Sequence, residues 1–341
     1  MEQPAGTPRV GVAGATGYAG AEVVSLLLEH PSAQLTQVSS RSQAGRVHRE
    51  ACLGSSCDLE LTEDLDSTSL EVVISAQSAL EAAAQAGAWL ESGALVIDVS
   101  ADFRLRAPEL YPTWYGRTHP APELLREAQL TVPELGLGSR EGRILALPGC
   151  FATAAILATA PALRSRLVQP SVVVDGKTGI SGAGRAAGSS YLFSELDEAV
   201  LPYSVPGHRH QPEIQQALSE FSRSAVEVTF VPHLVPMTRG ICVTCYLRWE
   251  GVPALERVRE EYQREYAASP FVHLVQAPVP TKLASRTNHT FIHLDAQGSH
   301  LVVEAVLDNL GRGAAWQAVQ ALNWRLGLDP AAGIGRAPQW P

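Results

Sequence analysis

A glycine-rich turn near the start of the chain restricts the fold more than any other feature. Residues 11–20 read GVAGATGYAG and lie between a strand-like run at 8–13 and a helix-like run at 19–29. Glycines in this setting allow a tight turn, let backbone N–H groups approach a pyrophosphate and place that anion at a helix N-terminus. The order of strand, turn and helix predicts a dinucleotide-binding fold, although the GxxGxxG spacing leaves open a turn that only packs the helix on the sheet. The predicted cofactor contacts here are Gly14, Ala15, Thr16, Gly17 and Tyr18.

The alternation of strand-like and helix-like runs indicates the class of fold. Further strand-like runs follow at residues 35–39, 71–76 and 94–99, with an alanine-rich helical run at 79–90. Strands that alternate with helices predict a parallel sheet covered on both faces. After residue 150 a helical run precedes longer β-rich runs, which favour a mixed or antiparallel sheet. These later segments are 152–163 (helix), 171–177, 226–231, 241–249, 300–307 and a last helix at 313–326.

The composition excludes several classes of protein. The 341 residues are 45% hydrophobic and 18% charged, and the formal net charge of −9 gives no basic surface for nucleic acid. The first six residues lack the basic and apolar parts of a signal peptide, and the apolar stretch at 151–163 is too short to span a membrane. We therefore expect a cytoplasmic enzyme acting on a small molecule, without nucleic-acid or membrane partners.

The cysteines do not suggest a disulfide framework, because there are five of them, an odd number. Cys242 and Cys245 have CxxC spacing, but they lie in a β-rich run, where positions three apart face opposite sides of a sheet. We therefore expect free thiols and no metal site.

The segment after the second predicted strand indicates which dinucleotide binds. An NAD enzyme usually carries an acidic residue there for the ribose 2′-hydroxyl, whereas this chain has Ser39, Ser40, Arg41 and Ser42. Hydroxyl groups and a guanidinium suit a 2′-phosphate, so the segment predicts NADP(H). An exposed arginine in a polar loop is the alternative interpretation.

Cys150 follows a Pro-Gly turn and stands directly before an apolar helical run. A thiol at that point is exposed to the helix dipole and to unpaired N–H groups, which favour the nucleophilic thiolate. The other cysteines lack this setting, so Cys150 is the candidate nucleophile. The alternative is a small buried hydrophobic residue, which is the commoner role of a cysteine.

A histidine pair, His208 and His210, flanks Arg209 just before Pro212. A histidine can titrate near neutral pH, and chemistry at an acyl carbon needs an acid or base. The pair is therefore the candidate acid/base, with a surface loop or a structural hydrogen bond as the alternative. The sequence leaves open which imidazole acts; alternation would place both on one side if the segment is extended.

Three arginines lie in segments bounded by glycine or proline, and such loops can direct a guanidinium to a phosphate or carboxylate. They are the candidate substrate contacts, although a single arginine in such a segment is more often a surface or structural residue: Arg104, Arg185 and Arg239.

With these motifs in this order, the chain resembles the N-acetyl-gamma-glutamyl-phosphate reductase family of arginine biosynthesis over nearly its whole length. The segments that carry the resemblance are Gly14–Gly20, Ser100–Arg104, Pro148–Cys150, Ile180–Arg185, His208–Ile214, Pro232–Ile241 and Asp308–Leu310.

The resemblance implies a fold like that of aspartate-semialdehyde dehydrogenase: a Rossmann-type α/β domain plus an α+β domain that carries the subunit interface. The implied division is 1–149 with 313–341 for NADP binding and 150–312 for catalysis and oligomerisation, in a homodimer or homotetramer. It also implies nicotinamide contacts near Ser181, Gly182 and Asn309. Trp316 departs from the small or polar residue usual in the family, which puts the local packing near the nicotinamide in doubt.

The implied reaction is the NADPH-dependent reduction of an acyl phosphate, N-acetylglutamyl phosphate, to its semialdehyde through a thioester on Cys150. The nearest alternative is the related reductase of lysine biosynthesis, whose aminoadipyl phosphate is attached to a small acidic carrier protein. An alternative of another class is a protein without catalytic activity that binds NADP and senses redox state.

Overall fold

The computed structural model describes residues 6–185, 188 and 191–334, which form two compact units. The described residues of the first unit lie within Met1–Pro133, Gly138–Pro148 and Ala314–Gly335, and those of the second within Glu134–Leu137 and Gly149–Gly313. Residues 1–5 and 335–341, which the sequence prediction assigned to the first domain, lie outside the described residues. No helix in the described part of the chain is long and apolar enough to cross a membrane.

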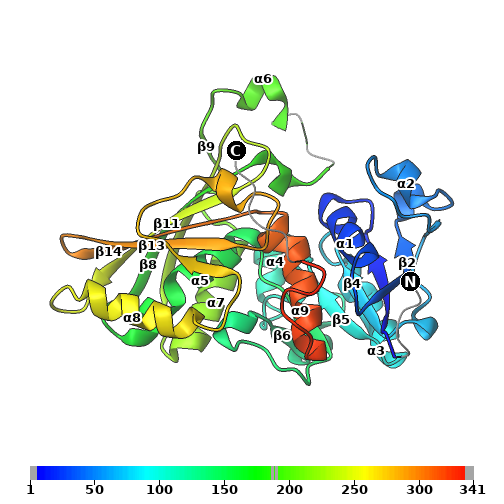
Figure 1. Ribbon diagram of the computed structural model, residues 1–341, viewed down its shortest axis with the longest axis horizontal. Helices are drawn as coiled ribbons and strands as arrows, with labels where there is room; N and C mark the ends of the chain where they lie inside the picture. The colour runs from blue at the N-terminus through cyan, green and yellow to red at the C-terminus, as the bar shows by residue number, and fades with distance from the viewer. Residues whose placement is uncertain (1–5, 186–187, 189–190, 335–341) are drawn as a thin grey trace. The chain divides into compact units, whose positions relative to one another are not determined.

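The first unit contains a sheet in which every neighbouring pair of strands is parallel (Figure 1). Its strand order is β3-β2-β1-β4-β5-β7-β6. The strands are β1 (Arg9–Ala13), β2 (Gln34–Ser39), β3 (Leu61–Thr62), β4 (Val72–Ser75), β5 (Leu95–Asp98), β6 (Ala128–Leu130) and β7 (Ile144–Ala146). The predicted parallel sheet is confirmed, and the direction of strand addition reverses between β1 and β4.

Five α-helices lie in the described part of the first unit, and at least one of them shares a buried core with the sheet. The helices are α1 (Tyr18–Leu28), α2 (His48–Ala51), α3 (Glu81–Glu91), α4 (Leu110–Tyr115) and α9 (Trp316–Leu326). All four residues of β4 are buried, as expected for a strand covered on both faces. Helix α3 contributes Ala82, Ala86 and Trp89 to a core cluster that also contains Val73 and Val96.

The last helix begins later than the sequence predicted. A π-helical turn at Gly311–Ala315 precedes it, so the regular helix starts at Trp316. The Trp316 side chain is fully buried, and its Nε1 donates to Glu22 Oε2 of α1 over 3.3 Å. Trp316 therefore contributes to the contact between α1 and α9.

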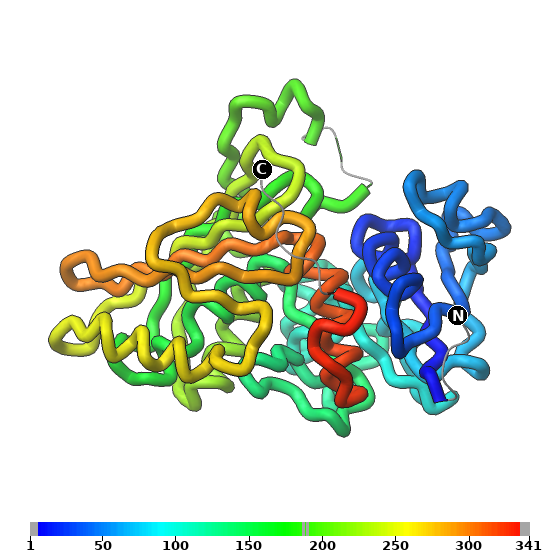
Figure 2. Tube along the Cα trace, viewed as in Figure 1, coloured from blue at the N-terminus to red at the C-terminus, as the bar shows by residue number. Residues whose placement is uncertain are grey.

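The second unit contains a mixed sheet, as the β-rich runs predicted. Its order is β12-β13-β14-β11-β8-β10-β9, with parallel pairing of β10 to β8 and of β12 to β13 and antiparallel pairing elsewhere. Strands β13 and β14 turn back at Gly298 (Figure 2). The strands are β8 (Val168–Thr178), β9 (Leu201–Pro202), β10 (Glu227–Leu234), β11 (Ile241–Trp249), β12 (Val272–Leu274), β13 (Thr290–Gln297) and β14 (His300–Leu307).

Helices α5 (Cys150–Ser165), α7 (His210–Ser222) and α8 (Leu255–Tyr266) belong to the second unit, with the short α6 (Phe193–Leu196). Helix α5 is buried along most of its length and packs against α7, α8 and the sheet. Along β11 burial alternates, so that Cys245 is buried whereas Cys242 points to the opposite face. The two thiols of the CxxC spacing are thus separated by the sheet, and all five cysteines are free.

Candidate active site

A cavity of about 320 Å³ lies in the first unit at the carboxyl ends of β1, β2 and β4. This is where the strand order reverses, the usual position of a ligand in an open parallel sheet. Its lining residues are Gly14, Thr16, Gly17, Ser39, Ser40, Arg41, Ser42, Glu63, Ala76, Gln77, Ser78 and Glu81. Most residues predicted at the cofactor are therefore gathered in one place.

The glycine turn is shaped for close backbone approach. Gly14 has a φ of +75°, and a Cβ at this position would lie 2.7 Å from the carbonyl oxygen of Ala76. A Cβ at Gly20 would collide with the Gly14 carbonyl oxygen. Gly17 is the N-cap of α1, so the cavity ends at a helix N-terminus, which suits an anion. The turn therefore fits a dinucleotide pyrophosphate.

Two residues predicted in this turn do not line the cavity. Ala15 is fully buried, and its carbonyl oxygen lies 3.0 Å from Nε2 of His48. The Tyr18 side chain is exposed. The loop after β2 contacts the glycine turn through a hydrogen bond of 2.7 Å between the hydroxyl groups of Thr16 and Ser40.

The sequence prediction missed Ala76, Gln77 and Ser78, which line the same cavity. They follow β4, and β4 lies beside β1 in the parallel sheet. Because the carboxyl ends of adjacent parallel strands meet, a prediction of strand order would have identified this segment.

In the second unit, Cys150 is the first residue of α5 and is partly exposed. The preceding Gly149 is extended, with φ −64° and ψ 161°, and serves as the N-cap. Gly313 stands directly against the cysteine, because a Cβ at Gly313 would lie 2.6 Å from the Cys150 Cβ. The thiol is thus at the N-terminus of a buried helix, as predicted, and Gly313 leaves room for its backbone.

A buried carboxylate holds the residue before the thiol. Glu213, in the first turn of α7, has no exposed surface, and its Oε2 accepts the Gly149 N–H over 3.0 Å. A buried amide without such an acceptor would be costly. Glu213 therefore fixes the start of α5 from α7. Sequence reasoning noted Glu213 in the histidine motif without giving it a role.

The two candidate imidazoles lie against each other and against α5. The ring centroids of His208 and His210 are 4.6 Å apart. The centroid of the Phe151 ring lies 6.4 Å from that of His208 and 6.2 Å from that of His210. The segment is not extended, since Arg209 is helical and His210 begins α7, so a turn and not strand alternation brings the rings together. The His210 N–H donates to Nδ1 of His208 over 3.1 Å.

Burial, with a smaller contribution from the Arg209 guanidinium, lowers the pKa of His208 to about 4. Tyr203, which the sequence prediction missed, packs its ring 5.6 Å from His208. Burial raises the pKa of the Tyr203 phenol, and the neighbouring Cys150 adds to that rise. Cys150, Tyr203 and the histidine pair are therefore neighbours within one unit.

The candidate substrate arginines occupy different surroundings. In the first unit Arg104 is buried and donates to the carbonyl oxygens of Val99 and Leu147, each over 2.9 Å. In the second unit Arg239 forms an ion pair with the buried Asp308, with Nε to Oδ2 at 2.9 Å and Nη2 to Oδ1 at 3.1 Å. Arg185 is exposed.

The residues predicted near the nicotinamide lie together in the second unit, with Ser181 and Asn309 buried and Gly182 exposed. Asn309 donates from Nδ2 to the Ser181 hydroxyl over 2.9 Å and accepts the N–H of Gly240 at Oδ1 over 2.8 Å. Gly182 lies beside them, where a Cβ would be 3.7 Å from Asn309 Nδ2. The side chain of Asn309 therefore links the loops that follow β8 and precede β11.

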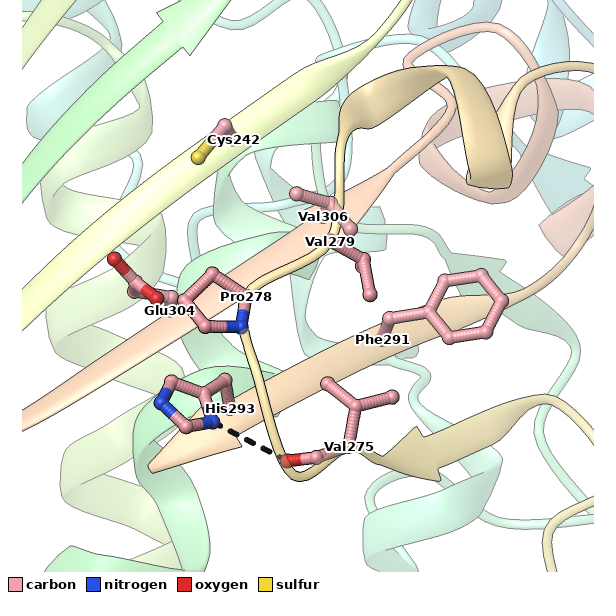
Figure 3. A pocket seen from close by; sticks show the side chains of 8 residues that line it. All are labelled: Cys242, Val275, Pro278, Val279, Phe291, His293, Glu304 and Val306. Atoms are coloured by element: carbon pink, nitrogen blue, oxygen red, sulfur yellow. Dashed lines mark hydrogen bonds between the residues drawn. The ribbon is translucent and has the colours of Figure 1, made fainter. Parts of the chain in front are cut away.

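A second, smaller cavity lies on the face of the mixed sheet that carries Cys242 (Figure 3). Its volume is about 60 Å³, and one wall is His293, whose Nδ1 lies 3.2 Å from the Val275 carbonyl oxygen. It contains none of the predicted site residues. Within residues 6–185, 188 and 191–334, no cluster of His, Cys, Asp or Glu is arranged to hold a metal ion.

Both parts of the chain match known families. The profile "Semialdehyde dehydrogenase, NAD binding domain" matches residues 9–139, and "Semialdehyde dehydrogenase, dimerisation domain" matches residues 150–309. The N-acetyl-gamma-glutamyl-phosphate reductase of Dehalococcoides mccartyi strain CBDB1 is 44% identical, covering 96% of this chain and 97% of that protein. The protein of the same name from Halorhodospira halophila is 41% identical, covering 95% of this chain and 97% of its own.

Solved structures share the fold at low identity. Aspartate semialdehyde dehydrogenase II from Vibrio cholerae, complexed with ASA, has a TM-score of 0.73 at 17% identity, covering 96% of this chain and 99% of that one. The Candida albicans aspartate semialdehyde dehydrogenase with NADP has a TM-score of 0.70 at 18% identity, covering 92% and 96% of the two chains. At this level of identity the likeness shows the fold alone.

Proposed function

This chain belongs to the N-acetyl-gamma-glutamyl-phosphate reductases, a family of oxidoreductases, and from that premise we propose that it reduces N-acetyl-L-glutamyl 5-phosphate with NADPH. The products are N-acetyl-L-glutamate 5-semialdehyde and phosphate, as arginine biosynthesis requires. The observation that carries the proposal is the position of Cys150 at the start of α5, with two imidazoles packed against the adjacent Phe151.

The first unit binds a nicotinamide dinucleotide, and we propose that NADP(H) is preferred. Support comes from Ser39–Ser42, which line the cavity and carry no carboxylate. Arg41 pairs with Asp64 over 3.2 Å, but about half of each side chain is exposed. Exposed ion pairs contribute little, so this guanidinium can turn to a 2′-phosphate at small cost.

In the first half of the proposed reaction, the Cys150 thiolate attacks the acyl carbon and forms a C–S bond. The electron pair of the C=O bond moves to oxygen, then returns as the C–O bond to phosphate breaks, leaving a thioester and phosphate. A proton from the histidine pair goes to the departing phosphate oxygen. The helix N-terminus favours the thiolate, and the Phe151 and Ala152 N–H groups, which have no acceptor within the helix, face the developing oxyanion.

In the second half, bound NADPH supplies the hydride that reduces the thioester carbonyl. The protein holds the acyl group covalently through the sulfur of Cys150. When the C=O bond re-forms, the Cys150 thiolate is expelled and the aldehyde is released. The thiolate leaves with the electron pair of the C–S bond and is ready for another cycle. One proton is consumed overall, and it ends on phosphate.

The three arginines have different proposed roles. Arg185, which is exposed, suits the charged groups of the substrate directly. Arg239 and Arg104 already hold Asp308 and the carbonyl oxygens of Val99 and Leu147. We therefore propose that these two orient the surrounding loops.

Assembly and location are part of the same proposal. Because the second unit matches a dimerisation domain, we propose a homodimer or homotetramer, measurable by light scattering at micromolar concentration. A monomer at all concentrations would contradict it. The five free cysteines suit the reducing cytoplasm, where we propose that the enzyme works.

The decisive assay runs the reaction in reverse. With N-acetylglutamate semialdehyde, NADP should be reduced only when phosphate is present, and faster than NAD. Reduction without phosphate dependence would contradict the acyl-phosphate chemistry. Preference for an aminoadipate semialdehyde on a carrier protein would identify the lysine enzyme, and NADP binding without turnover of either would identify a sensor.

A further inference from the structure

His208 is held in one tautomer by the backbone that follows it. Its Nδ1 accepts the N–H of His210 over 3.1 Å, in the turn that enters α7. A backbone amide can only donate, so Nδ1 carries no proton while this bond exists. The proton of the neutral ring is therefore on Nε2, and His208 presents that nitrogen as a hydrogen-bond donor.

The surroundings of His208 keep the ring uncharged. Phe230, Tyr203 and Phe151 pack edge-on around it, with centroids at 5.3, 5.6 and 6.4 Å. The charged or titratable groups that face it are Arg209 and His210 at the start of α7 and the Tyr203 phenol, which in turn interacts with Cys150. Burial and the Arg209 cation both disfavour an imidazolium, which holds the pKa of His208 well below neutrality.

His208 also lies beside the reacting atoms. Phe151 follows Cys150 in the chain and packs against the His208 ring. Tyr203 also packs against that ring, and its phenol interacts electrostatically with Cys150. Among the described residues, the hydrogen bond of His208 is made through Nδ1 and not through Nε2. Nε2 is also not one of the fully buried polar atoms that lack a hydrogen bond. Nε2–H is thus available to a ligand bound among Phe151, Tyr203 and Cys150.

Building on the proposed function, we infer that His208 is a catalytic hydrogen-bond donor and never transfers a proton. Its Nε2–H stabilises the oxygen of the acyl group on Cys150, and His210 alone supplies the proton that leaves with phosphate. When the thiolate attacks, the C=O electron pair moves onto oxygen and is held by Nε2–H. When the C–O bond to phosphate breaks, the pair returns and His208 keeps its proton.

The chemistry favours this division of labour. A donor aimed at a developing oxyanion needs a fixed proton, and a neutral imidazole provides one at every pH above its pKa. An acid that exchanges protons needs the opposite property, a charge that changes near the working pH. Two histidines two residues apart can satisfy both needs only if their surroundings differ.

The test compares two substitutions at His208 with one at His210. The amide Nε2 of glutamine can occupy the place of the imidazole Nε2–H but does not titrate. H208Q should therefore keep kcat within about tenfold of wild type and keep its pH profile, whereas H208A should lose about 10²–10³-fold in kcat. H210Q should lose activity together with one limb of the pH profile. H208Q as slow as H208A, or without that limb, would overturn the inference.

A second measurement does not depend on turnover. Long-range ¹H–¹⁵N spectra of histidine-labelled protein, assigned with H208Q, should show the Nε2–H tautomer from about pH 5 to about pH 8. An imidazolium signal from His208 in that range would refute the inference. If wild type fails to turn over N-acetylglutamate semialdehyde while this tautomer persists, the proposed function is wrong and the state of His208 stands.

Discussion

The two units of this chain form their candidate sites in different ways. In the first unit the cofactor cavity is shaped by backbone, and its key positions, Gly14 and Gly20, belong to one contiguous turn. In the second unit the thiol depends on side chains from distant segments, namely Glu213, Tyr203 and the histidine pair. A local motif can therefore identify the first part, whereas only tertiary structure completes the second.

The largest expected effect is a loss of turnover without a loss of NADPH binding, when the nucleophile of the second unit is removed. C150A should lower turnover by about 10⁴-fold or more, because no nucleophile remains to form the thioester. NADPH affinity, followed by fluorescence titration, should stay within about twofold, because Cys150 is not among the residues that line the dinucleotide cavity. C242A, on the far face of the mixed sheet, is the matched control and should keep activity. Turnover by C150A would refute the assignment of the nucleophile.

The next effect tests whether the backbone shape of the glycine turn is needed for cofactor binding. In G14A the new Cβ would meet the Ala76 carbonyl oxygen, so NADPH affinity should fall by about 10- to 100-fold, which corresponds to strain of about 1–3 kcal/mol. G45A is the control: Gly45 also has a positive φ, +82°, but no atom lies within 4 Å of its Cβ position. Equal losses in both variants would mean that general strain, and not the turn, controls affinity.

A smaller effect concerns the buried carboxylate of the second unit. E213A leaves the Gly149 N–H without its acceptor, which should reduce the free energy of unfolding by about 1–3 kcal/mol. E213Q keeps an acceptor oxygen and should lose less than half as much, measured by urea unfolding. If the two variants were equally stable, the hydrogen bond to Gly149 would not be what Glu213 contributes.

A pH-dependent effect concerns a buried carboxyl in the first unit. Asp98 is fully buried, and burial together with Asp102 raises its pKa to about 7. The unfolded value is about 3.9, so the folded state binds more protons between these values, and stability falls as pH rises through that window. D98N, which resembles the protonated acid, should melt at the wild-type temperature near pH 4 and a few degrees above it near pH 8. If the difference in melting temperature between D98N and wild type became smaller as the pH rises, the raised pKa of Asp98 would be contradicted.

Much of the fold could be predicted from periodicity. The buried runs that became β1, β4, β5 and β11 were recognised because continuous or alternating apolar residues leave a clear pattern. The strands β6 and β7 have only three residues each, too few for any periodicity to register. The start of α5 was placed two residues late because Gly149, an N-cap without a side chain, gives a weak signal.

The candidate site could be predicted from the sequence where its residues lie in one motif, but not where it depends on long-range contacts. The Gly14 turn and Cys150 could be read directly from their local setting. Tyr203 and the hydrogen bond from Gly149 to Glu213 could not, because that bond joins residues 64 positions apart. The hydrogen bond from the His210 N–H to Nδ1 of His208 depends on a turn at the start of α7, and the sequence left the conformation of this segment open.

The central claim is that Cys150 carries the acyl group, and trapping that adduct tests it most directly. Wild-type protein incubated with N-acetylglutamyl phosphate, without NADPH, and digested at low pH should give the Cys150 peptide with the mass of an N-acetylglutamyl thioester. The other four cysteines, at positions 52, 57, 242 and 245, should remain unmodified. An adduct on one of those, or protein that consumes the acyl phosphate and NADPH while Cys150 stays unacylated, would contradict the account.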